Sequence, residues 1–297
     1  MQEYFFANYR LLIDDEIAGM KSMQYLQGFR AAMSYTHTFI VHLGNPDLLD
    51  AEYEKTMSYP EACTTERFTF HDASDCWRIA CEFERFDSKY AVVSSRDYSE
   101  LTVYMPVNRF YSDKLKKWID PLFPFSLVRA ICEAGMVLRG GMPLHASLVE
   151  KDGCGVILLG PSGMGKSTQA KLWVQYQNAD FVIGDRPAVR CIDGVWYGFG
   201  MPWDGKDNIR TQKRVPVKAL ISLEQAKENQ ITRLNEQQAM MVLLNQVMMP
   251  LWDDEAMKHV TGMMERLAKA IPFYHLKNMP NEEAAALTYH TIFGDGD

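Results

Sequence analysis

The pattern G-x-x-x-x-G-K-S/T occurs at Gly160-Pro161-Ser162-Gly163-Met164-Gly165-Lys166-Ser167. Glycines in such a loop let backbone N–H groups turn inward and surround phosphate oxygens. Lys166 would then reach the β- and γ-phosphates of a nucleotide, and the Ser167 hydroxyl would ligate Mg²⁺. We expect ATP and Mg²⁺ as ligands, with nucleotide contacts from Gly160, Pro161, Ser162, Gly163, Met164, Gly165, Lys166, Ser167 and Thr168.

The elements around the loop have the pattern that such a site requires. The apolar run of residues 155–159 reads as a buried parallel strand that leads into the loop. After the loop, Ala170, Trp173 and Val174 recur at the spacing of one helix face. The positive N-terminal end of that helix would face the same phosphates.

Asp185 is the second residue with a chemical role to consider. It follows the short apolar strand 181–183 and Gly184, and one helix separates it from Lys166. Open α/β sheets place ligand-binding groups at the carboxyl ends of their strands. Asp185 would therefore hold Mg²⁺ or accept the proton of an attacking hydroxyl. His145, on a strand expected over residues 144–149, is a further candidate, although a lone histidine is more often structural.

Taken together, residues 145–149, the loop with its Ser162-Gly163 pair, and Ile183-Gly184-Asp185 resemble the HPr kinase/phosphorylase and phosphoenolpyruvate carboxykinase superfamily. The resemblance covers roughly residues 142–190 and, more loosely, the chain from Gly200 onward. It implies a P-loop kinase in which Asp185, His145 and Lys166 are catalytic and Ser167 and Asp185 hold the metal. The layout is similar to HPr kinase-like proteins that accompany peptide-modification systems.

This chain departs from the family pattern at the acidic position. The family has two adjacent aspartates, whereas here Asp185 stands between Gly184 and Arg186. If Asp185 corresponds to the second aspartate, Gly184 occupies the position of the first; if it corresponds to the first, Arg186 occupies the position of the second. The sequence leaves both alignments open. The chain is also much shorter than a carboxykinase and contains none of the substrate-binding motifs of one.

Phosphoryl transfer also needs cations that stabilise charge on the moving group. The basic residues Arg210, Lys213 and Arg214 are candidates, as is Arg186, and Arg210 and Lys213 are expected to be catalytic. A solvated basic turn is an equally good interpretation of this run. The segment 200–206, with glycine, proline and tryptophan, predicts a fixed loop near the nucleotide or the acceptor.

Composition restricts the class of partner. The 297 residues carry a net charge of −7, which argues against a nucleic-acid-binding surface. No apolar run is long enough for a membrane span, and the first residues lack the features of a secretory signal. The six cysteines have no metal-binding spacing, so reduced thiols in a cytoplasmic protein are expected.

We expect an α/β fold with two domains. Residues 1–118 read as a smaller, strand-rich domain that recognises the acceptor or a partner, and residues 119–297 as a mixed-sheet P-loop domain. The latter should contain helices over residues 125–139, 235–248 and 253–270, and a last helix that opens at Asn281.

The expected function is ATP- and Mg²⁺-dependent phosphoryl transfer to a hydroxyl on a protein, peptide or small molecule. One alternative is a carboxykinase-type reaction, which would need a second metal with His145 as ligand. Another is a regulatory protein that binds nucleotide without turnover, which the single aspartate permits. The sequence does not identify the phosphoacceptor.

Overall fold

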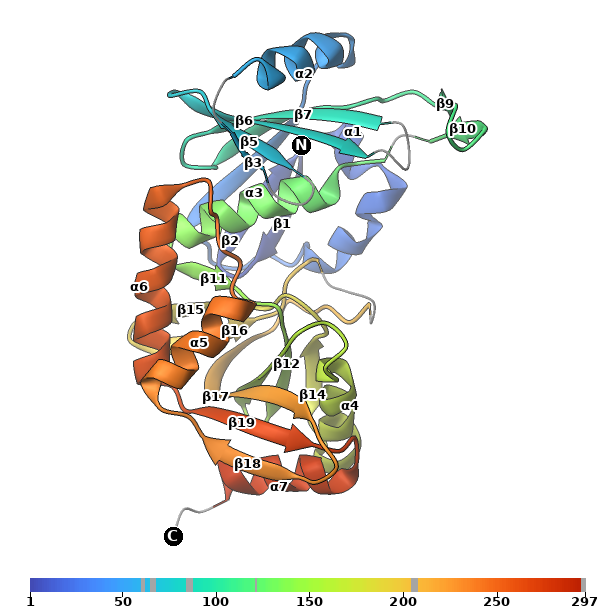
Figure 1. Ribbon diagram of the computed structural model, residues 1–297. Coiled ribbons are helices and arrows are strands. Elements are labelled where there is room, and N and C mark those ends of the chain that lie inside the picture. The colour runs from blue at the N-terminus through green and yellow to red at the C-terminus, as the bar shows by residue number, and fades with distance from the viewer. Residues whose placement is uncertain (60–61, 65–67, 84–87, 121, 204–207, 295–297) are drawn as a thin grey trace. The chain divides into compact units, whose positions relative to one another are not determined.

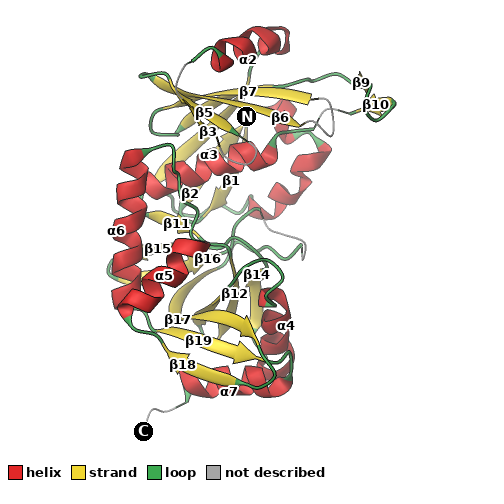
Figure 2. Ribbon diagram, viewed as in Figure 1, coloured by secondary structure: helices red, strands yellow, loops and turns green. Residues whose placement is uncertain are grey.

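The computed structural model describes residues 1–59, 62–64, 68–83, 88–120, 122–203 and 208–294 (Figure 1). The chain forms two compact units. Unit 1 comprises Met1–Gly135 and Pro250–Asp254, and unit 2 comprises Met136–Met249 and Glu255–Asp297. Figure 2 shows that both units combine helices with sheet, so the expected α/β class holds at that level.

Unit 1 is built on an eight-stranded sheet with the order β1-β2-β3-β8-β7-β6-β5-β4. Its pairings are antiparallel except β2 with β3 and β3 with β8, which are parallel. The strands are β1 (Gln2–Phe6), β2 (Tyr9–Ile13), β3 (His37–Leu43), β4 (Ala62–Thr64), β5 (Thr69–Asp72), β6 (Cys76–Phe83), β7 (Ser88–Ser95) and β8 (Glu100–Tyr104). Between them lie α1 (Asp15–Ala18), η1 (Lys21–Phe29), η2 (Pro46–Leu48) and α2 (Leu49–Met57).

Helix α3 (Phe125–Leu138) covers one face of this sheet, and α2 lies against β6 and β7 on the other (Figure 1). The helix approaches closely at Gly135, where an added Cβ would lie 2.6 Å from Phe39. The segment Pro250–Asp254 completes the same core. Trp252 stacks on Phe70 with ring centroids 3.7 Å apart, and its indole N–H donates to the Tyr98 hydroxyl at 2.9 Å.

The predicted domain boundary between residues 118 and 119 therefore falls inside unit 1. The compact units divide after Gly135 because most of α3 packs with the N-terminal sheet. Two short strands, β9 (Phe110–Ser112) and β10 (Lys117–Ile119), form a separate hairpin in the same unit.

Unit 2 is built on a mixed nine-stranded sheet. Its central order is β11-β15-β16-β17-β13-β12-β14, and β19 joins through β17 and in turn pairs with β18. The strands are β11 (Gly141–Pro143), β12 (Ala146–Lys151), β13 (Cys154–Leu159), β14 (Asp180–Ile183), β15 (Ala188–Ile192), β16 (Val195–Phe199), β17 (Arg214–Gln225), β18 (Gln230–Arg233) and β19 (Phe273–Asn278). The helices are α4 (Lys166–Gln177), α5 (Glu236–Gln246), α6 (Asp254–Ala270) and α7 (Glu282–Phe293).

Apolar burial holds α4 and α7 together against the sheet of unit 2. Trp173 of α4 is fully buried, and its indole N–H donates to Thr288 of α7 at 3.1 Å. Val156 and Leu158 of β13 and Ile221 of β17 belong to the same apolar cluster. This packing fixes the position at which α4 begins, directly after the glycine-rich loop.

The cysteines form no disulfide, and all six are free thiols. Within the described part of the chain, no helix combines the length and apolar character that a membrane crossing requires.

Candidate functional site

The glycine-rich loop, residues 160–165, connects the carboxyl end of β13 to the first residue of α4. Its glycines have backbone angles that other residues rarely adopt, with φ of +155° at Gly160, +83° at Gly163 and +97° at Gly165. An added Cβ at Gly163 or Gly165 would meet nothing within 4 Å. Since Gly165 is the N-cap of α4 and has no side chain, the helix begins without a side-chain cap and its first turn faces the loop.

Lys166 is held inside the curve of this loop. Lys166 is only 8% exposed. Its Nζ donates to the carbonyl of Gly160 at 2.6 Å and to that of Pro161 at 3.3 Å. Burial lowers the pKa of Lys166, and the nearby carboxylate of Asp185 opposes that shift. A buried ammonium group among carbonyl oxygens is a ready partner for an anion that enters the loop.

His145 lies beside that ammonium group. Its Nε2 is 3.2 Å from Lys166 Nζ and 3.8 Å from Asp185 Oδ1. The backbone holds the residue in place, because its N–H donates to the carbonyl of Gln246 at 2.6 Å. Burial lowers the pKa of His145, the charge of Lys166 lowers it further, and Asp185 acts in the opposite direction. The imidazole is therefore biased toward its neutral form, in which a ring nitrogen can accept a proton.

Asp185 reaches the same place because of strand topology. β12 is antiparallel to both β13 and β14, so the carboxyl ends of β13 and β14 meet at one edge of the sheet. The Ser147 hydroxyl donates to the carbonyl of Gly184 at 2.7 Å, and the Gly184 N–H donates to Ile209 at 3.1 Å. These bonds on both sides fix the backbone just before Asp185.

The Asp185 carboxylate has an unused acceptor. Its Oδ1 is buried and accepts no hydrogen bond from the described residues, and Oδ2 is 4.0 Å from Arg186 Nε. A buried carboxylate oxygen without a donor is costly unless a cation or a bound group satisfies it. Arg186 itself has a left-handed backbone with φ of +61°, an uncommon conformation for a residue with a side chain.

The other expected cations lie in different surroundings. Lys213 pairs with Glu150 of β12 and with Asp180, the first residue of β14. Asp180 precedes Asp185 by five residues, which is on the order of 15 Å along a strand. The Arg214 guanidinium lies over the ring of Tyr197, 4.6 Å from its centroid. The structure therefore does not bring Lys213 to the loop, since Asp180 at the start of β14 and Glu150, which pairs with it on β12, hold the lysine there.

Arg210 lies closer to the candidate site. Its backbone pairs with Ile183, two residues before Asp185, and its guanidinium donates to Asn208 at 2.9 Å. Gly200 is required nearby, because an added Cβ would meet the Thr211 carbonyl at 2.0 Å. Of the predicted loop 200–206, residues 204–206 lie outside the described residues.

The remaining nucleotide candidates occupy the loop and the first turn of α4. Pro161, Ser162, Gly163 and Thr168 are exposed, and Met164, Gly165 and Ser167 are partly exposed. Sequence reasoning missed Gln225, whose side-chain amide donates to the Gly163 carbonyl at 3.1 Å. Gln225 ends β17, the parallel neighbour of β13, and the shared carboxyl edge of those strands is the signal that could have indicated it.

Mg²⁺ at this site would need oxygen ligands from waters and from a bound phosphate in addition to those of the protein. In the described part of the chain, no three His, Cys, Asp or Glu side chains gather as a metal site. Ser167 and Asp185 would supply two oxygens. Mg²⁺ ordinarily keeps several waters and binds substrate phosphates in such sites, so two protein oxygens are compatible with it.

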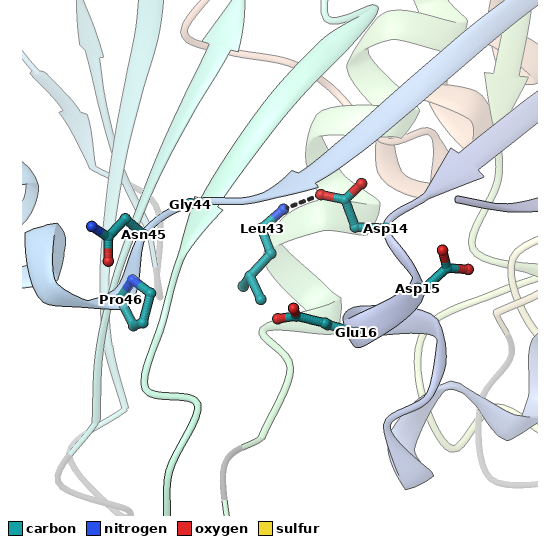
Figure 3. A pocket seen from close by; sticks show the side chains of 7 residues that line it. All are labelled: Asp14, Asp15, Glu16, Leu43, Gly44, Asn45 and Pro46. Carbon is teal, nitrogen blue, oxygen red and sulfur yellow. Dashed lines mark hydrogen bonds between the residues drawn. The ribbon is translucent and has the colours of Figure 1, made fainter.

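Unit 1 contains a pocket of about 410 Å³, and Figure 3 shows the side chains that line it. It is lined by Asp14, Asp15, Glu16, Leu43, Gly44, Asn45 and Pro46. Two of its carboxylates already have donors, because Leu43 N–H donates to Asp14 at 2.8 Å and the Gln2 amide to Asp15 at 2.6 Å. We assign this acidic pocket no role.

Comparison with known proteins gives little. No protein-family model matches the chain, and no curated protein sequence matches it. Among solved structures, the chain is similar to the HPr(Ser) kinase/phosphatase of Coxiella burnetii, with 12% identity over 49% of this chain and 85% of that chain and a TM-score of 0.29. A likeness at that level carries no argument about function, which must come from the residues of the site.

Proposed function

We propose that this protein is a P-loop kinase that transfers the γ-phosphoryl group of ATP to a hydroxyl on a protein, peptide or small molecule. The observation that carries the proposal is the cluster Lys166–His145–Asp185 next to the glycine-rich loop. It combines a buried cation, an imidazole biased toward neutrality and an unsatisfied carboxylate oxygen.

The residues divide the work by their chemistry. On nucleotide entry, Lys166 exchanges its loop carbonyl partners for phosphate oxygens, and the backbone N–H groups of the loop bind the remaining phosphate charge. Ser167 and Asp185 would hold Mg²⁺, and the ion would supply charge neutralisation at the phosphates. His145 or Asp185 accepts the proton of the acceptor hydroxyl.

Arg186 and Arg210 are the cations we retain for the transferring group. Arg186 adjoins Asp185, and Arg210 pairs through its backbone with the end of β14. Unit 1 then serves to select the acceptor, because the glycine-rich loop and the three clustered side chains all belong to unit 2.

The test is phosphoryl transfer by Asp185→Asn, which keeps the shape of the side chain and removes its charge. Purified protein is incubated with γ-phosphate-labelled ATP·Mg in lysate of the source organism, and labelled species are counted. We expect at least a ~100-fold loss of transfer with little change in the urea-unfolding midpoint, as the loss of transition-state charge stabilisation predicts.

Asp180→Asn is the matched control. It lies at the start of the same strand, is exposed, and pairs with Lys213. It should transfer phosphate like the parent protein. Normal transfer by Asp185→Asn would make that residue structural, and nucleotide binding without transfer in the parent protein would favour the regulatory alternative.

A further inference from the structure

A second cluster of polar side chains lies on β17 and β19, which are parallel neighbours in the sheet of unit 2 (Figure 1). Ser222 of β17 is directly opposite His275 of β19 in the register. The Ser222 hydroxyl is 2.9 Å from His275 Nδ1. On the other side of the ring, His275 Nε2 is 2.9 Å from Glu224 Oε2. A serine, a histidine and a carboxylate are thus joined in that order by two hydrogen bonds.

These two bonds determine which ring nitrogen of His275 carries the proton. A carboxylate only accepts hydrogen bonds, so Nε2 must donate to Glu224. In the neutral imidazole the other nitrogen is an acceptor, so Nδ1 accepts from the Ser222 hydroxyl. The carbonyl of Tyr274 is a longer alternative for that hydroxyl, at 3.4 Å. The imidazole is therefore placed to take the proton of the serine, with a carboxylate behind it, which is the arrangement that activates a serine nucleophile.

The cluster lies on the sheet face that is turned away from α4 and α7. Ile221 and Leu223 pack with the apolar side chains of those helices. Successive side chains of a strand point to opposite faces, so Ser222 and Glu224 lie on the other face. Ser222 is 9% exposed, whereas His275 is partly exposed and Glu224 is exposed. The imidazole therefore borders the solvent, and only a small reactant could reach the hydroxyl beside it.

Lys277 places a positive charge beside the cluster. It is directly opposite Glu224 in the register of β17 and β19 and two residues from His275 on the same strand, so the three side chains share one face. Lys277 is partly exposed. Attack of a hydroxyl on a carbonyl carbon develops negative charge on the carbonyl oxygen, and a nearby cation stabilises that charge.

We propose that Ser222 is a nucleophile that hydrolyses small acyl esters, with His275 as its base and Glu224 as the residue that orients the base. The Ser222 oxygen bonds to the ester carbonyl carbon while the hydroxyl proton passes to His275 Nδ1. The ester C–O bond then breaks, and the imidazolium gives this proton to the departing alcohol oxygen. Water attacks the acyl-serine with help from the same base, which releases the carboxylic acid and restores Ser222.

Ester hydrolysis goes beyond the proposed phosphoryl transfer and does not depend on it. The reaction uses none of the three side chains that cluster beside the glycine-rich loop, and it needs neither nucleotide nor metal. Its test can therefore fail while the kinase proposal stands, and the reverse also holds.

The experiment measures p-nitrophenyl acetate hydrolysis and labelling by a fluorophosphonate probe, with the full-length protein in EDTA and without ATP. We expect the probe on Ser222, located by peptide mass spectrometry. Ser222→Ala should abolish this labelling, and both Ser222→Ala and His275→Gln should lower the hydrolysis rate at least ~100-fold, as loss of a nucleophile or its base implies.

Glu224→Gln tests the positioning role, because it keeps the shape of the side chain and removes its charge. It should lower kcat for p-nitrophenyl acetate at least ~10-fold with little change in KM, since Glu224 acts only through His275. A merely structural role for Glu224 would lower the melting temperature without this division between kcat and KM.

Matched controls remove the same groups elsewhere. Ser94→Ala removes a buried hydroxyl that donates to the carbonyl of Ser95 at 3.2 Å, and His259→Gln removes an exposed histidine of α6. Both should hydrolyse the ester like the parent protein. Circular dichroism melting checks that each variant is folded. If Ser222→Ala is not, the position of the probe on the parent protein still decides the question.

Three outcomes would overturn the proposal. The first is a parent protein that the probe does not label at Ser222. The second is equal ester hydrolysis by the parent protein and a folded Ser222→Ala. The third is an unchanged hydrolysis rate in His275→Gln, which would leave the serine without its base.

Discussion

The charge of the His145 imidazole depends on two neighbouring residues, Lys166 and Asp185. Lys166 Nζ and Asp185 Oδ1 both lie within 4 Å of His145 Nε2, so the charges of these two groups act on the imidazole. Lys166 lowers the pKa of His145 and Asp185 raises it, after burial has had the largest effect. The charge state of this cluster is therefore a property of the folded chain that unfolding removes.

The first prediction follows from the lowered pKa of His145. As pH falls through the ordinary histidine pKa of about 6.5, the unfolded chain binds a proton at His145 before the folded chain does. This group therefore lowers the unfolding free energy below that pH and has no such effect above it. His145→Gln should reduce the loss of unfolding free energy between about pH 7.5 and about pH 5.5. Urea unfolding of both proteins across this pH range, in buffers that contain EDTA, measures the difference.

His259→Gln is the control for this pH dependence. His259 is exposed on α6, outside the three-residue cluster, so His259→Gln controls for the loss of a histidine as such. If His145→Gln shows the same slope as the parent protein, the imidazole does not titrate differently in the folded state and the electrostatic account of the cluster fails.

At the scale of elements, the glycines of the loop adopt left-handed backbone angles where β13 ends and α4 begins. Gly165 has φ of +97° and open space at its Cβ position. An alanine there meets no steric obstacle, so its cost is backbone strain alone. A glycine with a similar backbone angle in another turn provides a comparison.

Gly165→Ala should lower the unfolding free energy by about 1–2 kcal/mol and also weaken ATP·Mg binding, because it changes the loop that presents N–H groups to phosphate. Gly153→Ala is the matched control. Gly153 has φ of +75° in the turn between β12 and β13, also with open space. It should cost similar stability and leave binding unchanged. If both variants bound ATP·Mg equally well, the backbone geometry at Gly165 would have no part in nucleotide binding.

Sequence patterns located several helices well. The helix expected over residues 125–139 is α3, which ends at Leu138, and the one expected over 253–270 is α6, which begins at Asp254. The strand expected over residues 144–149 is shifted, because β12 runs from Ala146 to Lys151 and Leu144 instead makes a single bridge to Val247. Periodicity fixes an element's type more firmly than its ends.

The surroundings of the candidate site were less accessible to sequence reasoning. His145 and Asp185 could be named from their places beside strands, but the position of Lys213 depends on which residues lie opposite Asp180 across the sheet. A run of basic residues shows no such register. The Gln225 contact likewise needs the parallel pairing of β13 with β17, which links residues far apart in the chain.

At the scale of the whole molecule, the chain returns to unit 1 after forming most of unit 2. Trp252 and Asp253 lie in the core of unit 1, where the Tyr98 hydroxyl donates to Asp253 at 2.8 Å. A truncation that begins near Ile119 would remove these partners. The recognition role proposed for unit 1 is therefore better tested by surface substitutions than by deletion.

The central claim is that the glycine-rich loop binds nucleotide phosphate through Lys166. Calorimetric titration with ATP·Mg tests it most directly, with Lys171→Ala as the control because Lys171 is exposed on the same helix. The account predicts binding by the parent protein and Lys171→Ala and a loss of at least ~10-fold in affinity for Lys166→Ala, as the removal of a charge-assisted bond implies. Unchanged affinity in Lys166→Ala, or no binding by the parent protein, would contradict it.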